Sequence, residues 1–275
     1  MLFGMDTAKL LRVMPGKVCK LSRWDPGANG GFAGSEQAKG ELAANVKRLA
    51  ELQEMLYAEN QRSVLLVLQG MDTSGKDGTV KHVLSGLNPM GVKVYGFGRP
   101  SSEELDHDYL WRVHARSPAR GEIGVFNRSH YEDVLTVLVN KVISAATARQ
   151  RYRQINDFER MLTENGTIVV KCMLYISKAE QKRRLEGRLK DPLKNWKFQA
   201  GDLDARKQWG LYMRAYEAAL GATSTPHAPW HVIPADRKWH RNLAVSEVLV
   251  QTLEAQRPRL SPPKPRMNLT GVRVV

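Results

Sequence analysis

Hydrophobic and polar positions along the chain divide it into two parts. Up to residue 62, a glycine-rich loop at 27–35 precedes a helical pattern from Glu36 to about Asn60, in which apolar residues recur every three or four positions. From Ser63 onward, short apolar runs alternate with helical patterns, as strands alternate with helices around a parallel sheet. The predicted fold class is therefore α/β, with a parallel sheet flanked by helices on both faces.

Five apolar runs predict the strands of this sheet. The run at 63–69 is apolar almost throughout, which is typical of a central strand buried on both sides. The others lie at 92–97, 122–127, 167–177 and 230–235. Helices are expected from the glycine loop to Leu87, from a Ser101–Glu104 capping box through 106–115, twice between His130 and Glu164, and from Lys238 to about Ala255.

This pattern gives three predicted parts: an N-terminal extension at 1–62, a core at 63–256, and a proline-rich tail at 257–275. The core includes a basic helical segment at about 178–220. Neither the start of the chain nor any apolar run has the length and flanks of a secretion signal or a membrane span. Cys19 and Cys172 lie in no metal-ligand spacing, and Cys172 falls in an apolar run, which indicates a buried thiol. We therefore expect a cytoplasmic protein with no membrane partner.

Composition adds one feature to this picture, a formal net charge of +14 over 275 residues. A strongly basic surface attracts polyanions such as nucleic acid, anionic lipid, nucleotides and polyphosphate. The same charge also has a simpler explanation, that it keeps the protein soluble. Only a binding site can distinguish these possibilities.

The clearest candidate site is the segment from Gly70 to Lys76, directly after the first predicted strand and before a helix. Its glycine, four-residue gap, glycine and lysine are the spacing of a phosphate-binding loop. Glycines let successive backbone N–H groups point at phosphate oxygens, the helix N-terminus adds a positive dipole, and the lysine lies along the terminal phosphates. The alternative is a glycine-rich turn without a ligand, which strand, spacing, lysine and helix together disfavour.

One position departs from the common pattern, because Asp77 stands where most such loops place a magnesium-binding Ser or Thr. Asp72 offers a carboxylate oxygen inside the loop, and Mg²⁺ typically takes one or two carboxylates together with phosphate oxygens and water. Asp72 is therefore assigned to binding the metal or to orienting the attacking phosphate. The alternative is that it bonds only to the backbone of the loop.

A second group of candidates follows the third predicted strand, at the carboxyl edge where open parallel sheets bind ligands. Asn127 occupies the place of a strand-end carboxylate, and Arg128 is suited to bind phosphate oxygens in a bidentate way. His130, Glu132 and Asp133 are first interpreted as structural. Asn127 and Asp133 are nevertheless the candidate nucleotide contacts.

The third group lies in the basic segment that starts at Lys182. A basic helical insertion beside a phosphate loop is typical of a lid that closes over phosphates, although charge runs are usually only solvated helix faces. Arg188 is the residue expected to meet the transferring phosphoryl group. The candidate phosphate contacts are Gly70, Thr73, Ser74, Gly75, Lys76, Asp77, Gly78, Thr79, Lys81, Arg128, Arg184 and Arg188.

Three stretches in this order, GMDTSGKDGTVKH, GVFNRSHYEDV and RLKDPLKNWKF, resemble the Walker A, Walker B and lid motifs of polyphosphate kinase family 2. The resemblance runs from about Arg12 to about Leu253. It implies a P-loop kinase fold similar to thymidylate kinase, a reaction that needs Mg²⁺ or Mn²⁺, a basic channel for polyphosphate, and a homodimer or homotetramer. The catalytic residues it implies are Asp72, Lys76, Arg128 and Arg188.

Asn127 stands where other branches of this family have aspartate, and the resulting FNRS resembles the branch that accepts both AMP and ADP. The expected reaction is direct in-line transfer between inorganic polyphosphate and an adenine or guanine nucleotide, with AMP converted to ADP and ADP to ATP. One alternative is a nucleoside monophosphate kinase that uses ATP. Another is a nucleic-acid-binding protein, which the absence of a recognisable binding module and of clustered aromatic residues disfavours. No nucleic-acid partner is therefore expected.

Overall fold

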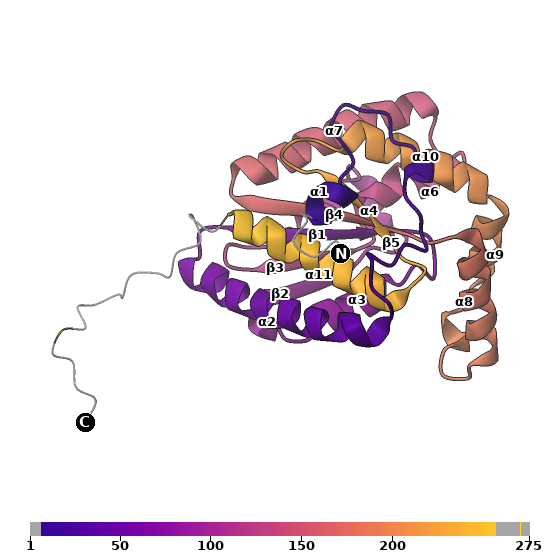
Figure 1. Ribbon diagram of the computed structural model, residues 1–275. Coiled ribbons are helices and arrows are strands. Elements are labelled where there is room, and N and C mark those ends of the chain that lie inside the picture. Colours follow the sequence, from indigo (N-terminus) through magenta and orange to yellow (C-terminus); the bar gives the residue numbers. More distant parts are fainter. Residues whose placement is uncertain (1–6, 257–269, 271–275) are drawn as a thin grey trace.

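A five-stranded sheet forms the centre of the computed structural model, which describes residues 7–256 and residue 270 (Figure 1). The strands follow the order β2-β3-β1-β4-β5, and every neighbouring pair is parallel. All five predicted strands are present, which confirms the α/β class. They span Ser63–Gln69 (β1), Val92–Gly96 (β2), Ile123–Asn127 (β3), Thr167–Tyr175 (β4) and Trp230–Pro234 (β5).

Strand β1 lies at the middle of the sheet, and all of its residues are buried. Val64 pairs with Ile123 of β3 on one side and with Ile168 of β4 on the other. Helices cover both faces of this strand, so neither set of alternating side chains meets water, and the strand is apolar on both faces. The loop that follows β1 therefore leaves the sheet at its centre.

Two groups of helices cover the sheet, one on each face (Figure 1). Helices α2, α3 and α11 pack together on one face, and α7 and α10 pack together on the other. The N-terminal extension belongs to the first group, because α2 buries Leu49, Leu52 and Leu56 in the common core. The five helices span Ser35–Glu59 (α2), Lys76–Val83 (α3), Ala145–Glu164 (α7), Trp209–Thr223 (α10) and Lys238–Ala255 (α11).

The chain before α2 covers the outer edge of β5. Arg12 forms an antiparallel bridge with His231, and the amide of Val13 donates to the carbonyl of Trp230 at 2.8 Å. An edge strand left open would offer unpaired backbone groups to other chains.

The shorter helices span Thr7–Leu11 (α1), Ser102–Asp106 (α4), Trp111–His114 (α5), Thr136–Val139 (α6), Lys178–Lys190 (α8) and Ala200–Lys207 (α9), with 3₁₀ turns at Leu21–Arg23 (η1), Pro89–Gly91 (η2), His130–Asp133 (η3) and Asn195–Lys197 (η4).

Helices α8 and α9 project together from one end of the molecule (Figure 1). They lie in the predicted basic segment, which enters them from β4 and returns to the core through α10. The side chain of Ser177 caps α8 by accepting from the amide of Glu180. The helical character of the lid segment is thus confirmed.

Three helix boundaries differ from the sequence prediction. Helix α3 ends at Val83 instead of Leu87, because the chain turns at Gly86 and Pro89. The helix predicted at 106–115 is broken, because Asp108 accepts from the amide of Leu110 in a local turn. Two helices were predicted between 130 and 164, but only α7 is long. The first part of this range forms the short η3 and α6.

Several predictions concern the chain as a whole. Within the described part of the chain, no helix is long and apolar enough to cross a membrane. Both cysteines are free and buried, as expected for Cys172, and burial raises the pKa of the Cys19 thiol to about 11. The predicted tail at 257–275 lies outside the described residues except for residue 270.

Candidate active site

The loop between β1 and α3 has the geometry of a phosphate-binding loop. Gly75 caps α3 with a φ of 104°, and the amide of Ser74 donates to the carbonyl of Met71 at 3.0 Å. A tight turn thus delivers the chain from the centre of the sheet to the N-terminus of a helix. Free backbone N–H groups and the helix dipole at that point favour an anion.

Two glycines in this loop are required by their surroundings. A Cβ at Gly70 would lie 2.7 Å from both the carbonyl oxygen of Leu174 and Oγ of Ser74, and a Cβ at Gly75 would lie 1.7 Å from Nη1 of Arg241. Both glycines also have positive φ, 152° and 104°. A side chain at Gly70 would collide with the backbone of β4, one at Gly75 would collide with the guanidinium group of Arg241, and either would strain the backbone of the loop.

Lys76, the first residue of α3, folds back over the loop. Its Nζ donates to the carbonyl of Gly70 at 2.8 Å and to that of Met71 at 3.4 Å. Burial lowers the pKa of Lys76, whereas the nearby carboxylate of Asp72 raises it. The ammonium group is therefore held in place before any phosphate arrives.

Asp72 is bonded to two other groups at the cleft. Nη2 of Arg128 lies 2.6 Å from Oδ1 of Asp72, which joins the phosphate loop to the end of β3. The carboxyl of Asp202, in α9, is hydrogen-bonded to that of Asp72. Burial raises the pKa of Asp202, and the charge of Asp72 raises it further. Burial also acts to raise the pKa of Asp72, but the nearby cations Lys76, Arg128 and Arg188 lower it below its usual value.

Asp77 joins the lid to the core. The amide nitrogen of Asn127 donates to Oδ1 of Asp77 at 2.8 Å, and Nζ of Lys197 in η4 donates to Oδ2 at 3.0 Å. Asn127, predicted to contact the nucleotide, therefore has a partner in the protein. The unusual aspartate after the loop lysine connects three separate segments.

Asp133, a predicted nucleotide contact, faces the cleft beside Arg112. Arg112 was not predicted as a site residue. Nη2 of Arg112 lies 3.6 Å from Oδ2 of Asp133, and Nη1 donates to the carbonyl of Gly98 at 3.0 Å. Burial raises the pKa of Asp133, although the charge of Arg112 lowers it.

The predicted structural role of His130 is supported by its complete burial, with Nε2 3.2 Å from Glu159.

Two guanidinium groups support the phosphate loop. Arg184, predicted to contact phosphate, donates to the carbonyls of Thr73 and Ser74 at 2.8 and 3.2 Å and to those of Ala235 and Asp236 at 2.7 and 2.8 Å. Arg241 donates to the carbonyl of Ser74 at 3.2 Å. These contacts tie the base of lid helix α8 and the start of α11 to the back of the loop.

A cleft of about 1930 Å³ brings most of the predicted site residues together. It lies at the carboxyl ends of β1 and β3, between the phosphate loop and the lid, as expected for an open parallel sheet. Among the described residues that line it, thirteen are lysine or arginine and seven are aspartate or glutamate. The predicted residues on its wall are Gly70, Asp72, Thr73, Gly75, Lys76, Asp77, Gly78, Asn127, Arg128, Asp133, Arg184 and Arg188.

Three predicted phosphate contacts do not line the cleft. The side chains of Ser74 and Thr79 are fully buried, and the hydroxyl of Thr79 donates to the carbonyl of Gly75 within α3. Lys81 is exposed on α3 away from the cleft wall. A helix turns by about 100° per residue, so Thr79 and Lys81, three and five residues after Lys76, face other sides of α3 than Lys76 does.

Sequence reasoning did not identify several residues that line this cleft. Asp202, Arg112 and Arg241 contact the predicted site, and α10 contributes Tyr212 and Tyr216 to its wall. No spacing could reveal them, because each comes from an element far from the loop in sequence.

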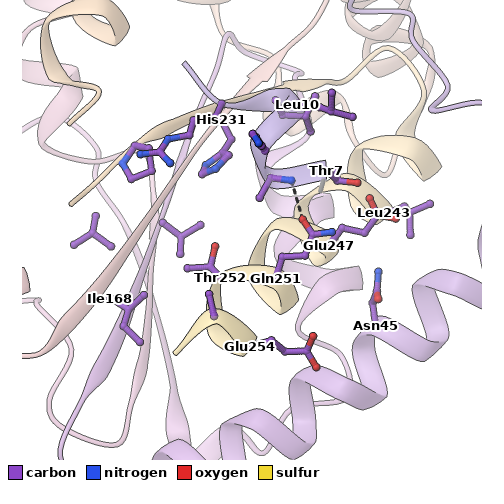
Figure 2. Close-up of a pocket in the computed structure, with 18 of the residues that line it drawn as sticks. Thr7, Leu10, Asn45, Ile168, His231, Leu243, Glu247, Gln251, Thr252 and Glu254 are labelled. Carbon is purple, nitrogen blue, oxygen red and sulfur yellow. Dashed lines mark hydrogen bonds between the residues drawn. The ribbon is translucent and has the colours of Figure 1, made fainter. Parts of the chain in front are cut away.

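Figure 2 shows a second cavity, of about 1440 Å³, between α1, β4 and α11. Leu10, Ile168 and Leu243 give it apolar walls, and Gln251 accepts from the amide of Ala8 at 2.8 Å. None of the predicted site residues lines it. The cleft above the phosphate loop is therefore the candidate active site.

The central phosphate loop, the strand-end arginine and the basic lid define a P-loop kinase fold with a phosphotransferase site. The model of the polyphosphate kinase 2 family matches residues 33–261. The chain therefore belongs to the polyphosphate kinase 2 family, as the sequence motifs indicated.

Individual relatives are similar over nearly the whole chain. An AMP/ADP-polyphosphate phosphotransferase of Meiothermus ruber is 52% identical over 90% of this chain and 92% of its own length. An ADP-polyphosphate phosphotransferase of Rhodopseudomonas palustris is 44% identical over 90% of each chain. The crystal structure of polyphosphate kinase 2 from Arthrobacter aurescens TC1 superposes with a TM-score of 0.92 at 46% identity, over 98% of this chain and 95% of that one.

Proposed function

We propose that this protein is a polyphosphate kinase that transfers phosphoryl groups between inorganic polyphosphate and nucleotides. The observation that carries the proposal is the cleft, where a phosphate loop and a lid enclose a volume with an excess of positive charge. At about 1930 Å³ it exceeds the roughly 300–1,000 Å³ of an ordinary ligand pocket, which leaves room for two phosphate-bearing substrates. The family and the names of its relatives support the same reaction.

The proposed mechanism is direct in-line transfer without a covalent enzyme intermediate. The attacking nucleotide phosphate is already anionic, so no general base is needed, and positioning and charge neutralisation provide most of the catalysis. Lys76 is held at the phosphate loop, Arg128 at the end of β3, and Arg188 on the lid helix. Each cation reaches the cleft from a different element, so the three surround the transferring group.

The proposed cofactor is Mg²⁺, with Mn²⁺ as an alternative. Among the described residues, no three histidine, cysteine or acidic side chains are grouped to hold a metal by themselves. Asp72 and Asp202 nevertheless bring two carboxyl groups together beside the phosphate loop, and Mg²⁺ in phosphoryl-transfer sites uses one or two carboxylates with substrate phosphates. The residues present thus fit the ion, which would neutralise phosphate charge.

Removing the metal tests this assignment. Chelation with EDTA is expected to abolish transfer, and added Mg²⁺ to restore it. Asp72→Asn is expected to raise the Mg²⁺ concentration for half-maximal activity by at least about tenfold, because it removes a carboxylate ligand. Paramagnetic resonance of Mn²⁺ with polyphosphate present measures binding directly. Equal Mn²⁺ affinity for the parent and Asp72→Asn proteins would rule out Asp72 as a ligand.

The acceptor is proposed to include both AMP and ADP, on the basis of Asn127 and of the relative from Meiothermus ruber. Purified protein, Mg²⁺ and long-chain polyphosphate are incubated with AMP or ADP separately, and nucleotides are resolved over time. We expect ADP and then ATP from AMP. ATP formed only from ADP would retain the polyphosphate donor and exclude AMP. Transfer seen only with ATP as donor would indicate a nucleoside monophosphate kinase instead.

Other properties stay predictions from the sequence and the family resemblance. They are a homodimer or homotetramer, a cytoplasmic location, guanine nucleotides as further acceptors, and the absence of a nucleic-acid partner. Light scattering during gel filtration measures the assembly. Parallel assays with GMP and GDP measure base selectivity.

A further inference from the structure

A group of buried polar side chains lies beneath the loop that carries Arg128. Lys171, Glu159 and Tyr131 are all 0% exposed, and none of them lines the cleft. Nζ of Lys171 donates to Oε2 of Glu159 at 2.6 Å, to the hydroxyl of Tyr131 at 2.9 Å and to the carbonyl of Thr223 at 2.7 Å. The Tyr131 hydroxyl donates to the other carboxylate oxygen of Glu159 at 2.8 Å. Each proton of the lysine ammonium group therefore has an acceptor.

Stability alone explains such a group poorly. Burying an ammonium and a carboxylate carries a desolvation penalty that their attraction often fails to exceed, and well-packed apolar replacements are frequently neutral or stabilising. Hydrogen bonds at fixed angles, by contrast, hold the joined elements in one arrangement. The elements that Lys171 joins are therefore informative.

Lys171 lies in β4 and connects two walls of the active site. Tyr131 belongs to η3, whose next two residues, Glu132 and Asp133, line the cleft. Thr223 is the last residue of α10, which contributes Tyr212 and Tyr216 to the cleft. A single ammonium group thus fixes the strand-end loop and the helix that returns from the lid.

The strand-end loop needs such an anchor, because Arg128 adopts a left-handed backbone conformation with a φ of 64°. This conformation is disfavoured for a residue with a side chain and persists only where neighbouring contacts impose it. Three residues later Tyr131 is locked into the core, and between them Oγ of Ser129 accepts from the amide of Tyr131 at 3.2 Å. The buried end of this short loop therefore limits where the Arg128 side chain can lie.

We propose that Lys171, with Glu159 and Tyr131, is a positioning group that sets the place of Arg128 above the phosphate loop. The inference rests on the proposed function, in which Arg128 neutralises the transferring phosphoryl group. The three buried side chains touch no substrate and act only through the backbone of 128–131. Disturbing them should therefore lower kcat more than it raises KM, because Arg128 is needed most in the transition state.

Tyr131→Phe is the most direct test, since it removes one hydroxyl and leaves Lys171 and Glu159 paired. The matched control is Tyr152→Phe in α7, because Tyr152 is also buried and its hydroxyl has no hydrogen-bond partner among the described residues. We expect Tyr131→Phe to lower kcat by about tenfold or more, since small displacements of catalytic groups have effects of this size. Tyr152→Phe should leave kcat unchanged.

A double-mutant cycle separates positioning from general weakening of the fold. In an Arg128→Ala background, Tyr131→Phe should cause almost no further loss of kcat, while its shift of the melting temperature remains the same in both backgrounds. An equal loss of kcat in both backgrounds, or a Tyr131→Phe enzyme as active as Tyr152→Phe, would overturn the positioning role. Lys171→Met should show the same coupling more strongly. If Lys171→Met does not fold, the Tyr131 cycle decides.

The transfer activity of the parent protein distinguishes failure of the proposed function from failure of the positioning role. A parent that transfers no phosphoryl group from polyphosphate refutes the proposed function and this inference with it. An active parent whose cycle is additive refutes only the positioning role.

Discussion

Replacing Lys76 with alanine is expected to lower kcat for transfer from polyphosphate to ADP by on the order of a thousandfold. The ammonium group is buried and held 2.8 Å from the carbonyl of Gly70, so its charge acts where little water screens it. Water that fills the vacated space cannot supply a fixed positive charge. Initial rates with saturating substrates measure the loss, and circular dichroism with thermal melting confirms the fold.

The control for this prediction is Lys47→Ala, which removes one positive charge from an exposed position on α2 outside the cleft. It tests whether net charge alone accounts for polyphosphate turnover. We expect it to retain parental kcat. A folded Lys76→Ala enzyme within tenfold of the parent would contradict the role of Lys76 at the phosphate loop.

The phosphate loop was predictable from sequence because its residues are contiguous. A buried apolar run, seven residues with the right glycines and lysine, and a helix determine one another locally, and the structure places Gly70, Asp72 and Lys76 on the cleft wall as expected. Contiguity also explains why Ser74, Thr79 and Lys81 were named as phosphate contacts although none of the three lines the cleft. Position in a motif does not say which side of a turn or helix a side chain faces.

Contacts between distant segments could not be read in this way. The carboxyl of Asp202 reaches Asp72, and Lys197 reaches Asp77, only because the lid folds toward the phosphate loop. Arg184 shows the converse: its charge and position indicated a phosphate contact, yet its donors bond to backbone carbonyls that the sequence could not locate. Tertiary hydrogen bonding decides whether an arginine is available to a ligand.

The same limit explains the fold boundaries. The strands were predicted within about two residues, and for β1, β3, β4 and β5 the reason is that burial on both faces leaves apolar runs. The short η3 and α6 after β3 were not predicted, because the apolar residues there suit a longer helix. The chain must instead turn at this point to present Arg128. A positive φ at Lys141 and the cap at Ser144 then delay the long helix until Ala145.

Arg188→Ala is the second substitution expected to reduce turnover by on the order of a thousandfold, because in the proposed mechanism the lid brings this arginine onto the transferring phosphoryl group. Arg188 lies one helical turn beyond Arg184, whose guanidinium ties the base of α8 to the phosphate loop. Its Nη1 is 3.7 Å from Oδ2 of Asp202, which itself bonds to Asp72. The side chain is therefore held beside the loop and remains partly accessible to phosphate.

Three measurements distinguish a role in the transition state from a weaker role in binding. Loss of a transition-state contact lowers kcat and kcat/KM together, whereas loss of simple polyphosphate attraction raises KM alone. Guanidinium ions added to Arg188→Ala should restore part of kcat, because the vacated site accepts the missing group, and should not stimulate the parent. Lys178→Ala removes a charge from an exposed position of the same helix outside the cleft and should leave kcat unchanged. A rise in KM without a fall in kcat would place Arg188 in substrate capture instead of phosphoryl transfer.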